Sequence, residues 1–93
     1  MERRAPADAV RKEPQCYYVY ILRLSNNRYY LGCTNDIDNK LNRHQNGYVD
    51  STKHFLPVEL IFYSVFFDEY KAYSFEKYLK TGSGRAFTIR HLV

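Results

Sequence analysis

The chain has 93 residues, of which 45% are hydrophobic and 17% aromatic, with ten Tyr and no Trp. A chain of this length forms one domain with a thin core, and its composition is that of a globular protein. The longest strongly apolar run, residues 60–67, is far shorter than the roughly 20 residues of a membrane-spanning helix, and no signal-peptide pattern is present. Two cysteines do not make a disulfide framework or a zinc site. We therefore expect a cytoplasmic protein with reduced thiols and no membrane partner.

Charge is unevenly distributed along the chain, whose net charge is +4. Residues 71–93 hold five basic residues and one acid, whereas residues 34–70 hold six acids and three basic residues. A basic C-terminal quarter can face a polyanion such as nucleic acid. A solvated helix face beside an ordinary tail explains the same pattern equally well.

The first half of the chain predicts a tail and a hairpin. Residues 1–14 are polar and show no periodicity, which predicts a flexible N-terminal tail and leaves residues 15–93 as the domain. Residues 17–24 alternate as a strand does. Residues 25–27, Ser-Asn-Asn, are typical of a tight turn, and residues 28–33 form the return strand.

A helix and a third strand follow the hairpin. Asn35 is a plausible N-cap for a helix with Ile37 and Leu41 on its apolar face, and Gly47 is suited to end it. Residues 58–67 form a nearly continuous apolar run, which predicts a central strand buried on both faces.

A second helix completes the predicted order β-β-α-β-α. Asp68 caps this helix, and Gly82 and Gly84 are expected to end it, with one or two further helical turns within residues 86–93. Its inward-facing residues are spaced as on one face of a helix: Ala72, Phe75 and Leu79.

Glu76 is the most unusual residue of the second helix. Its position, four after Ala72 and three before Leu79, places a carboxylate in the core-facing stripe. An unpaired buried carboxylate costs several kcal/mol, so such a group is normally paired or bound to a metal. Two interpretations stay open at this point: a salt bridge to Lys40 or Lys80, or a metal ligand.

Lys40 and His44 flank the apolar stripe of the first helix. A cation and an imidazole that project towards a tyrosine-rich sheet are suited to bind phosphate. The alternative is that Lys40 only extends its stem along the apolar surface and that His44 is an edge histidine with satisfied hydrogen bonds.

Two loops combine hydroxyl groups, backbone donors and a cation, which suits phosphate contacts. They are residues 51–53, Ser-Thr-Lys, and residues 81–85, Thr-Gly-Ser-Gly-Arg. Neither has the spacing of a nucleotide-binding P-loop. An ordinary loop and an ordinary helix C-cap explain them equally well.

The hairpin carries the most specific motif. Tyr18-Val19-Tyr20 and Tyr30-Leu31-Gly32 resemble the two half-motifs that name the GIY-YIG nuclease family, and the similarity extends over residues 17–85. Within the family, the chain is similar to small stand-alone bacterial members related to the UvrC nuclease module. The resemblance implies an α+β fold in which a three-stranded antiparallel sheet is flanked by helices.

The resemblance also implies roles for individual residues. Tyr20 and Tyr30 match the tyrosines of the half-motifs, Glu76 matches the metal-ligating carboxylate, and His44 matches a histidine common in this subgroup. Lys40 stands where the family has arginine. Substrate contacts are expected from a wider set of residues: Tyr18, Gly32, Thr34, Asn35, Ser51, Thr52, Lys53, Lys80 and Arg85.

The predicted function is metal-dependent hydrolysis of DNA phosphodiester bonds, selective for structure more than for sequence. One Mg²⁺ or Mn²⁺ is expected on Glu76. Tyr20 would position or deprotonate the attacking water if neighbouring cations lower its pKa. Lys40 offers a charge without the two-pronged hydrogen bonding of arginine, so weak activity is expected.

Two alternatives stay open. The same fold without catalysis would be a nucleic-acid-binding module, because Lys40 replaces arginine. A structural or interaction domain whose exposed tyrosines contact protein is the other. The sequence leaves the choice between a monomer and a weak homodimer undecided.

Overall fold

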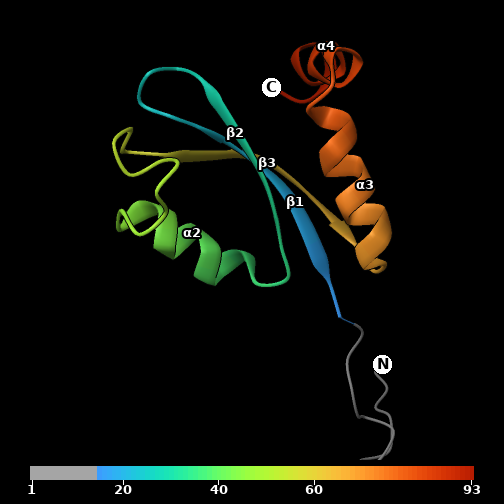
Figure 1. Cartoon of the computed structure of the whole chain (residues 1–93), viewed down its shortest axis with the longest axis horizontal. Helices are drawn as coiled ribbons and strands as arrows, with labels where there is room; N and C mark the ends of the chain where they lie inside the picture. Colours follow the sequence, from blue (N-terminus) through green and yellow to red (C-terminus); the bar gives the residue numbers. More distant parts are fainter. Residues whose placement is uncertain (1–14) are drawn as a thin grey trace, which may run out of the picture.

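A computed structural model describes residues 15–93, so the tail predicted for residues 1–14 lies outside the described residues. The elements follow one another as β1 (Tyr17–Arg23), β2 (Tyr29–Thr34), α2 (Ile37–Gln45), β3 (Glu59–Phe66), α3 (Glu69–Leu79) and α4 (Gly82–His91) (Figure 1). The predicted α+β fold and its β-β-α-β-α order are confirmed, with a third helix added at the end. Within residues 15–93, no helix is long and apolar enough to cross a membrane.

The three strands form one antiparallel sheet in the order β2-β1-β3. The central strand β1 is the most deeply buried, and its alternation separates two faces of the sheet. Val19 and Ile21 point to one face, whereas Tyr20 and Leu22 point to the other, and all four are buried.

The prediction that residues 58–67 form the central strand is wrong, because β3 lies at an edge of the sheet. The side of β3 that shares a face with Tyr20 is open, with Tyr63 51% and Val65 47% exposed. The Tyr63 ring contacts Tyr18, with ring centroids 6.0 Å apart. An apolar run does not distinguish a strand buried on both faces from an edge strand that keeps an apolar patch exposed.

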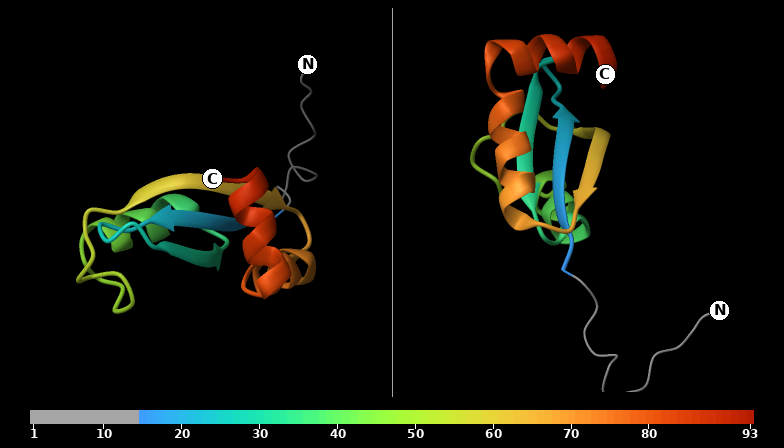
Figure 2. Two further views of the ribbon diagram at one scale, coloured as in Figure 1. Left: turned by 90° about the horizontal axis from the view of Figure 1, so that it is seen from above. Right: turned by 90° about the vertical axis from the view of Figure 1, so that its right-hand side faces the viewer.

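Helices cover both faces of the sheet (Figures 1 and 2). The predicted apolar stripe of α2, Ile37 and Leu41, packs against the face that carries Tyr20 and Leu22. On the opposite face, the predicted inward residues of α3 pack in the cluster around Val19: Ala72, Phe75 and Leu79. The two helices are therefore separated by the sheet.

Small residues fix the hairpin turn and the two ends of α2. Asn27 has φ 68° at the hairpin, and Gly47 has φ 78° after α2, as the turn and helix-end patterns predict. The N-cap of α2 is Asp36 and not Asn35, because the Asp36 side chain accepts a hydrogen bond from the Asn39 backbone N–H at 3.1 Å.

The two glycines predicted to end the second helix instead begin α4. Thr81 is the N-cap, and its Oγ1 accepts a hydrogen bond from the Gly84 N–H at 3.0 Å. A Cβ at Gly84 would overlap the backbone of Tyr78 and Leu79. Gly84 therefore lets α4 start in close contact with the end of α3, and α4 lies across that end (Figure 2).

Candidate active site

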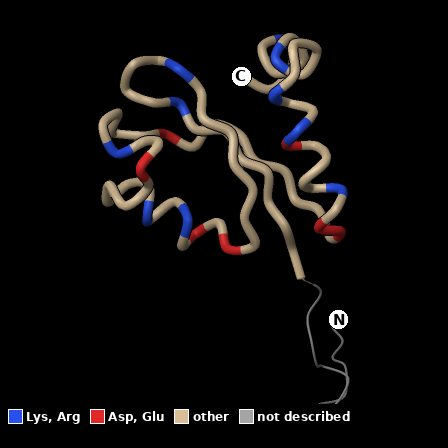
Figure 3. Tube along the Cα trace, viewed as in Figure 1, with Lys and Arg blue, Asp and Glu red and all other residues tan. Residues whose placement is uncertain are grey.

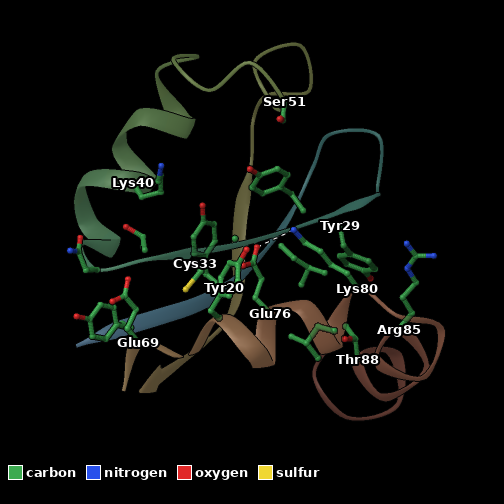
Figure 4. Close-up of a pocket in the computed structure, with 18 of the residues that line it drawn as sticks. Tyr20, Tyr29, Cys33, Lys40, Ser51, Glu69, Glu76, Lys80, Arg85 and Thr88 are labelled. Carbon is green, nitrogen blue, oxygen red and sulfur yellow. Dashed lines mark ion pairs between the residues drawn. The ribbon is translucent and has the colours of Figure 1, made fainter. Parts of the chain in front are cut away.

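A pocket of about 1550 Å³ runs along β2. All six residues of this edge strand line it, together with Lys40 of α2, Glu76 of α3 and Arg85 of α4. The helices on opposite faces of the sheet thus bring side chains to a common site at its edge. Figure 4 shows Tyr20 and Glu76 next to each other in the middle of this site.

The structure brings most of the predicted site residues into this pocket. Its predicted lining residues are Tyr20, Tyr30, Gly32, Thr34, Asn35, Lys40, Ser51, Glu76, Lys80 and Arg85. Tyr18 does not line it, and neither does Lys53, whose Nζ lies 3.4 Å from Asp50 Oδ1. His44 and Thr52 are fully buried, so neither can touch a substrate directly.

Gly32 makes room for the Tyr20 ring. The two residues are paired across β1 and β2. A Cβ at Gly32 would overlap the Cζ and hydroxyl of Tyr20. The absence of a side chain at Gly32 lets the Tyr20 ring lie against β2, so that it lines the pocket at the sheet edge.

Gly32→Ala is therefore expected to destabilise the fold by about 1–3 kcal/mol, the usual cost of overfilling a packed site. Urea unfolding at neutral pH measures the loss. Gly82→Ala is the control, because a Cβ at Gly82 would meet nothing within 4 Å. Equal stability of Gly32→Ala and the natural chain would contradict this role of Gly32.

A buried chain of hydrogen bonds holds the Tyr20 hydroxyl. Its oxygen lies 3.0 Å from His44 Nε2, and His44 Nδ1 lies 2.8 Å from Thr52 Oγ1. In one tautomer Tyr20 donates to Nε2 and Nδ1–H donates to Thr52; in the other, both bonds run in the opposite direction. The alternative that His44 has satisfied hydrogen bonds is confirmed, but His44 is buried and does not lie at an edge. Because His44 and Thr52 are fully buried, neither is placed to contact phosphate. Together the two side chains hold the Tyr20 hydroxyl in place.

The pKa values of this pair are displaced in opposite directions. Burial raises the pKa of Tyr20, and the neighbouring Tyr30 and Glu76 raise it further. The condition that neighbouring cations lower the pKa of Tyr20 is not met, because burial and nearby acidic groups raise it. Burial, together with nearby Lys40, lowers the pKa of His44. Both side chains are neutral at physiological pH.

The lowered pKa of His44 gives a testable pH dependence. Below the ordinary histidine pKa of about 6.5, the unfolded chain binds a proton that the native His44 resists, so stability falls as the pH falls. The slope from this residue is at most about 1.4 kcal/mol per pH unit. Urea unfolding at several pH values between 7.5 and 5.5 should show a steeper loss for the natural chain than for His44→Gln. Equal slopes would contradict a buried neutral His44.

Glu76 is paired with a cation. Its Oε2 lies 3.0 Å from Lys80 Nζ, and its side chain is 13% exposed, whereas that of Lys80 is 53% exposed. Of the two partners predicted from the sequence, Lys80 is the one in contact. The prediction that Glu76 lies on the core-facing side of α3 is confirmed.

The surroundings of Glu76 fit a hard divalent cation that keeps most of its water. Among residues 15–93 no cluster of three or more His, Cys, Asp or Glu side chains could enclose a metal. Mg²⁺ does not need such a cluster, because it commonly takes one or two carboxylates, several waters and substrate phosphate oxygens. A carboxylate that opens into a large pocket and already attracts one cation meets this requirement.

Cations surround the pocket on four elements of the chain. Figure 3 shows basic residues on the hairpin, α2, α3 and α4. The basic lining residues are Arg28, Lys40, Lys80 and Arg85. The acidic lining residues are Glu69 and Glu76. Sequence reasoning missed Arg28 and Glu69, because only the sheet order and the position of α3 place them at the β2 edge.

Most of the chain matches one family of known proteins. A family model described as the GIY-YIG catalytic domain matches residues 16–89. No curated protein matches the sequence. The fold is similar to the solution NMR structure of the UPF0213 protein BH0048 from Bacillus halodurans, with a TM-score of 0.53 and 24% identity over 81% of this chain and 83% of that chain. The family match covers most of the chain, and the chain therefore belongs to the GIY-YIG family, a family of nucleases that act on nucleic acids.

Proposed function

We propose that this protein is a metal-dependent endonuclease that hydrolyses DNA phosphodiester bonds. The observation that carries the proposal is that one pocket contains Tyr20, Tyr30, Lys40 and Glu76 together. Hydrolysis of a phosphodiester needs a water aligned for in-line attack, a cation on the phosphate oxygens and stabilisation of the leaving oxygen. The four side chains provide groups for each of these tasks.

Tyr20 is the residue proposed to orient the attacking water and take its proton. Because burial raises its pKa, a free tyrosinate is disfavoured. The contact with His44 offers another route: Tyr20 passes its own proton to Nε2 as it accepts one from the water. In the tautomer in which Nδ1–H donates to Thr52 Oγ1, Nε2 is the acceptor that this transfer needs. Tyr20 then stays neutral before and after the transfer, and His44 becomes an imidazolium, which its lowered pKa makes short-lived.

Glu76 and Lys40 act on the phosphate from two sides. Glu76 would hold the divalent ion, which when bound supplies Lewis-acid polarisation of a phosphate oxygen and stabilises the leaving oxygen. Lys40 reaches the pocket from α2 and offers a positive charge to a non-bridging oxygen. Tyr30, whose ring lies 6.5 Å from that of Tyr20 between centroids, offers a further hydroxyl to phosphate or water.

The cationic rim supports selectivity for DNA structure more than for sequence. Arg28, Lys80 and Arg85 suit phosphate oxygens, and phosphate contacts carry no sequence information by themselves. An open pocket along the edge of the protein sheet can admit a DNA strand, and no helix or strand of the protein has to enter a DNA groove to read bases.

A cleavage assay tests the proposal. Supercoiled plasmid, branched DNA, single-stranded DNA and RNA are incubated with Mg²⁺, with Mn²⁺ or with EDTA. Metal-dependent cleavage of DNA, strongest for branched or single-stranded substrates, is the expected result. Salt-dependent DNA binding without cleavage would instead support the non-catalytic binding module, since Lys40 stands in place of arginine. Absence of both would overturn any nucleic-acid function.

A further inference from the structure

Lys80 is paired with the carboxylate that is proposed to hold the metal ion. Its ammonium lies 3.0 Å from Oε2 of a carboxylate that is only 13% exposed. Both side chains line the pocket. A divalent ion on the same carboxylate would lie within a few ångströms of the ammonium, and the repulsion between them would weaken its binding.

We propose that Lys80 is a built-in counter-ion of the metal site, which neutralises Glu76 when no metal is bound and moves to a substrate phosphate when a metal arrives. The inference rests on the proposed function, because it takes Glu76 as the metal ligand. In this proposal Lys80 couples metal binding to DNA binding, in addition to adding positive charge to the pocket.

The position of Lys80 permits this movement. It is the C-cap residue of α3, and its side chain is half-exposed, so the flexible stem can turn into the pocket without disturbing the core. Figure 4 shows Lys80 between Glu76 and Arg85, on the side of the pocket formed by α3 and α4. A phosphate bound near Glu76 would therefore lie within reach of the released ammonium.

A thermodynamic consequence follows. Without DNA, Lys80 competes with the metal for Glu76. With DNA, phosphate oxygens attract Lys80 and release the carboxylate. By linkage, DNA then tightens metal binding, and metal tightens DNA binding by the same factor. Removing the Lys80 charge should tighten metal binding in free protein and reduce the effect of DNA on it.

The experiment titrates the full chain with Mn²⁺ and measures free Mn²⁺ by electron paramagnetic resonance, so no turnover is required. The variants are Lys80→Met, the matched control Lys77→Met and the site control Glu76→Gln. Lys77 neighbours Glu76 in sequence on the same helix, but its Nζ lies over the Tyr73 ring, 5.6 Å from the centroid. The titrations are repeated with a single-stranded DNA dodecamer whose intactness is checked on a gel.

The expected result is that Lys80→Met binds Mn²⁺ about five- to tenfold more tightly than the natural chain, whereas Lys77→Met changes the affinity less than about twofold. The dodecamer should tighten Mn²⁺ binding to the natural chain, and it should tighten Mn²⁺ binding to Lys80→Met by a smaller factor. Equal affinities for Lys80→Met and Lys77→Met, with binding still dependent on Glu76, would overturn the role of Lys80 and leave the proposed metal site intact. Binding that Glu76→Gln does not weaken would overturn both.

Discussion

Replacement of Glu76 by glutamine is expected to lower metal-dependent DNA cleavage by about 10³-fold or more. Glutamine keeps the shape of the side chain but removes the charge that would hold the divalent ion, and a loss of about 4 kcal/mol of transition-state stabilisation gives this factor. The fold should persist, because Lys80 is half-exposed and its released ammonium can return to water. The expected loss of stability is below about 1 kcal/mol. Plasmid nicking with Mg²⁺ and thermal unfolding measure the two effects.

Glu69→Gln is the matched control, since Glu69 is the other acidic residue that lines the pocket. It should retain most of the activity, and neither variant should bind DNA more weakly in EDTA than the natural chain does. A large drop in melting temperature for Glu76→Gln with little change in metal-dependent cleavage would mean that Glu76 acts only as the partner of Lys80.

The hairpin and the helix faces could be predicted from the sequence because local patterns determine them. Alternation and the Ser25–Asn27 turn indicate β1 and β2, and the spacing of Ala72 and Leu79 identifies the inward face of α3. The same spacing singles out Glu76. These features depend on residues close together in the chain, where periodicity is informative.

The sheet order could not be predicted in the same way. Which strand is central depends on pairing between segments that are distant in the sequence. The sequence of β3 is as apolar as that of a central strand, although its side chains Tyr63 and Val65 are exposed. Gly82 and Gly84 were predicted to end a helix, but they begin α4. Glycine suits both a helix end and a close approach of two backbones, and only the contact of Gly84 with the end of α3 decides between them.

The buried chain behind Tyr20 was missed for a related reason. Helical spacing places His44 beside the apolar stripe of α2 but does not show whether its side chain is buried. The loop that follows α2 folds back and puts Thr52 against Nδ1, which closes His44 off from solvent. A histidine followed by a hydroxyl residue eight positions later is too common a pattern to predict this contact.

One feature of the site depends on the whole fold: side chains from helices on opposite faces of the sheet line the same pocket. α2 packs on one face of the sheet and α3 on the other, yet Lys40 and Glu76 line one pocket because β2 is an edge strand. A wider sheet would separate them. The small three-stranded sheet is therefore a condition for the arrangement of charges in the pocket.

Lys40→Arg is expected to raise the rate of DNA cleavage by about 10²- to 10³-fold. A lysine ammonium acts as a point charge, whereas a guanidinium donates two parallel hydrogen bonds to phosphate oxygens. One additional charge-assisted bond that strengthens in the transition state contributes roughly 2–4 kcal/mol, by analogy with an oxyanion donor. Because the gain arises in the transition state, binding of uncleaved DNA should hardly change. Single-turnover cleavage at saturating Mg²⁺ measures the rate, and DNA binding in EDTA measures the affinity.

Lys53→Arg separates this effect from a general benefit of arginine, because Lys53 lies outside the pocket and is paired with Asp50. It should leave both rate and affinity unchanged. If Lys40→Arg tightens DNA binding as much as it accelerates cleavage, position 40 contributes equally to the ground state and the transition state. If it changes neither, Lys40 does not contact the phosphate during the reaction, and the α2 wall of the pocket serves only to position Tyr20 through His44.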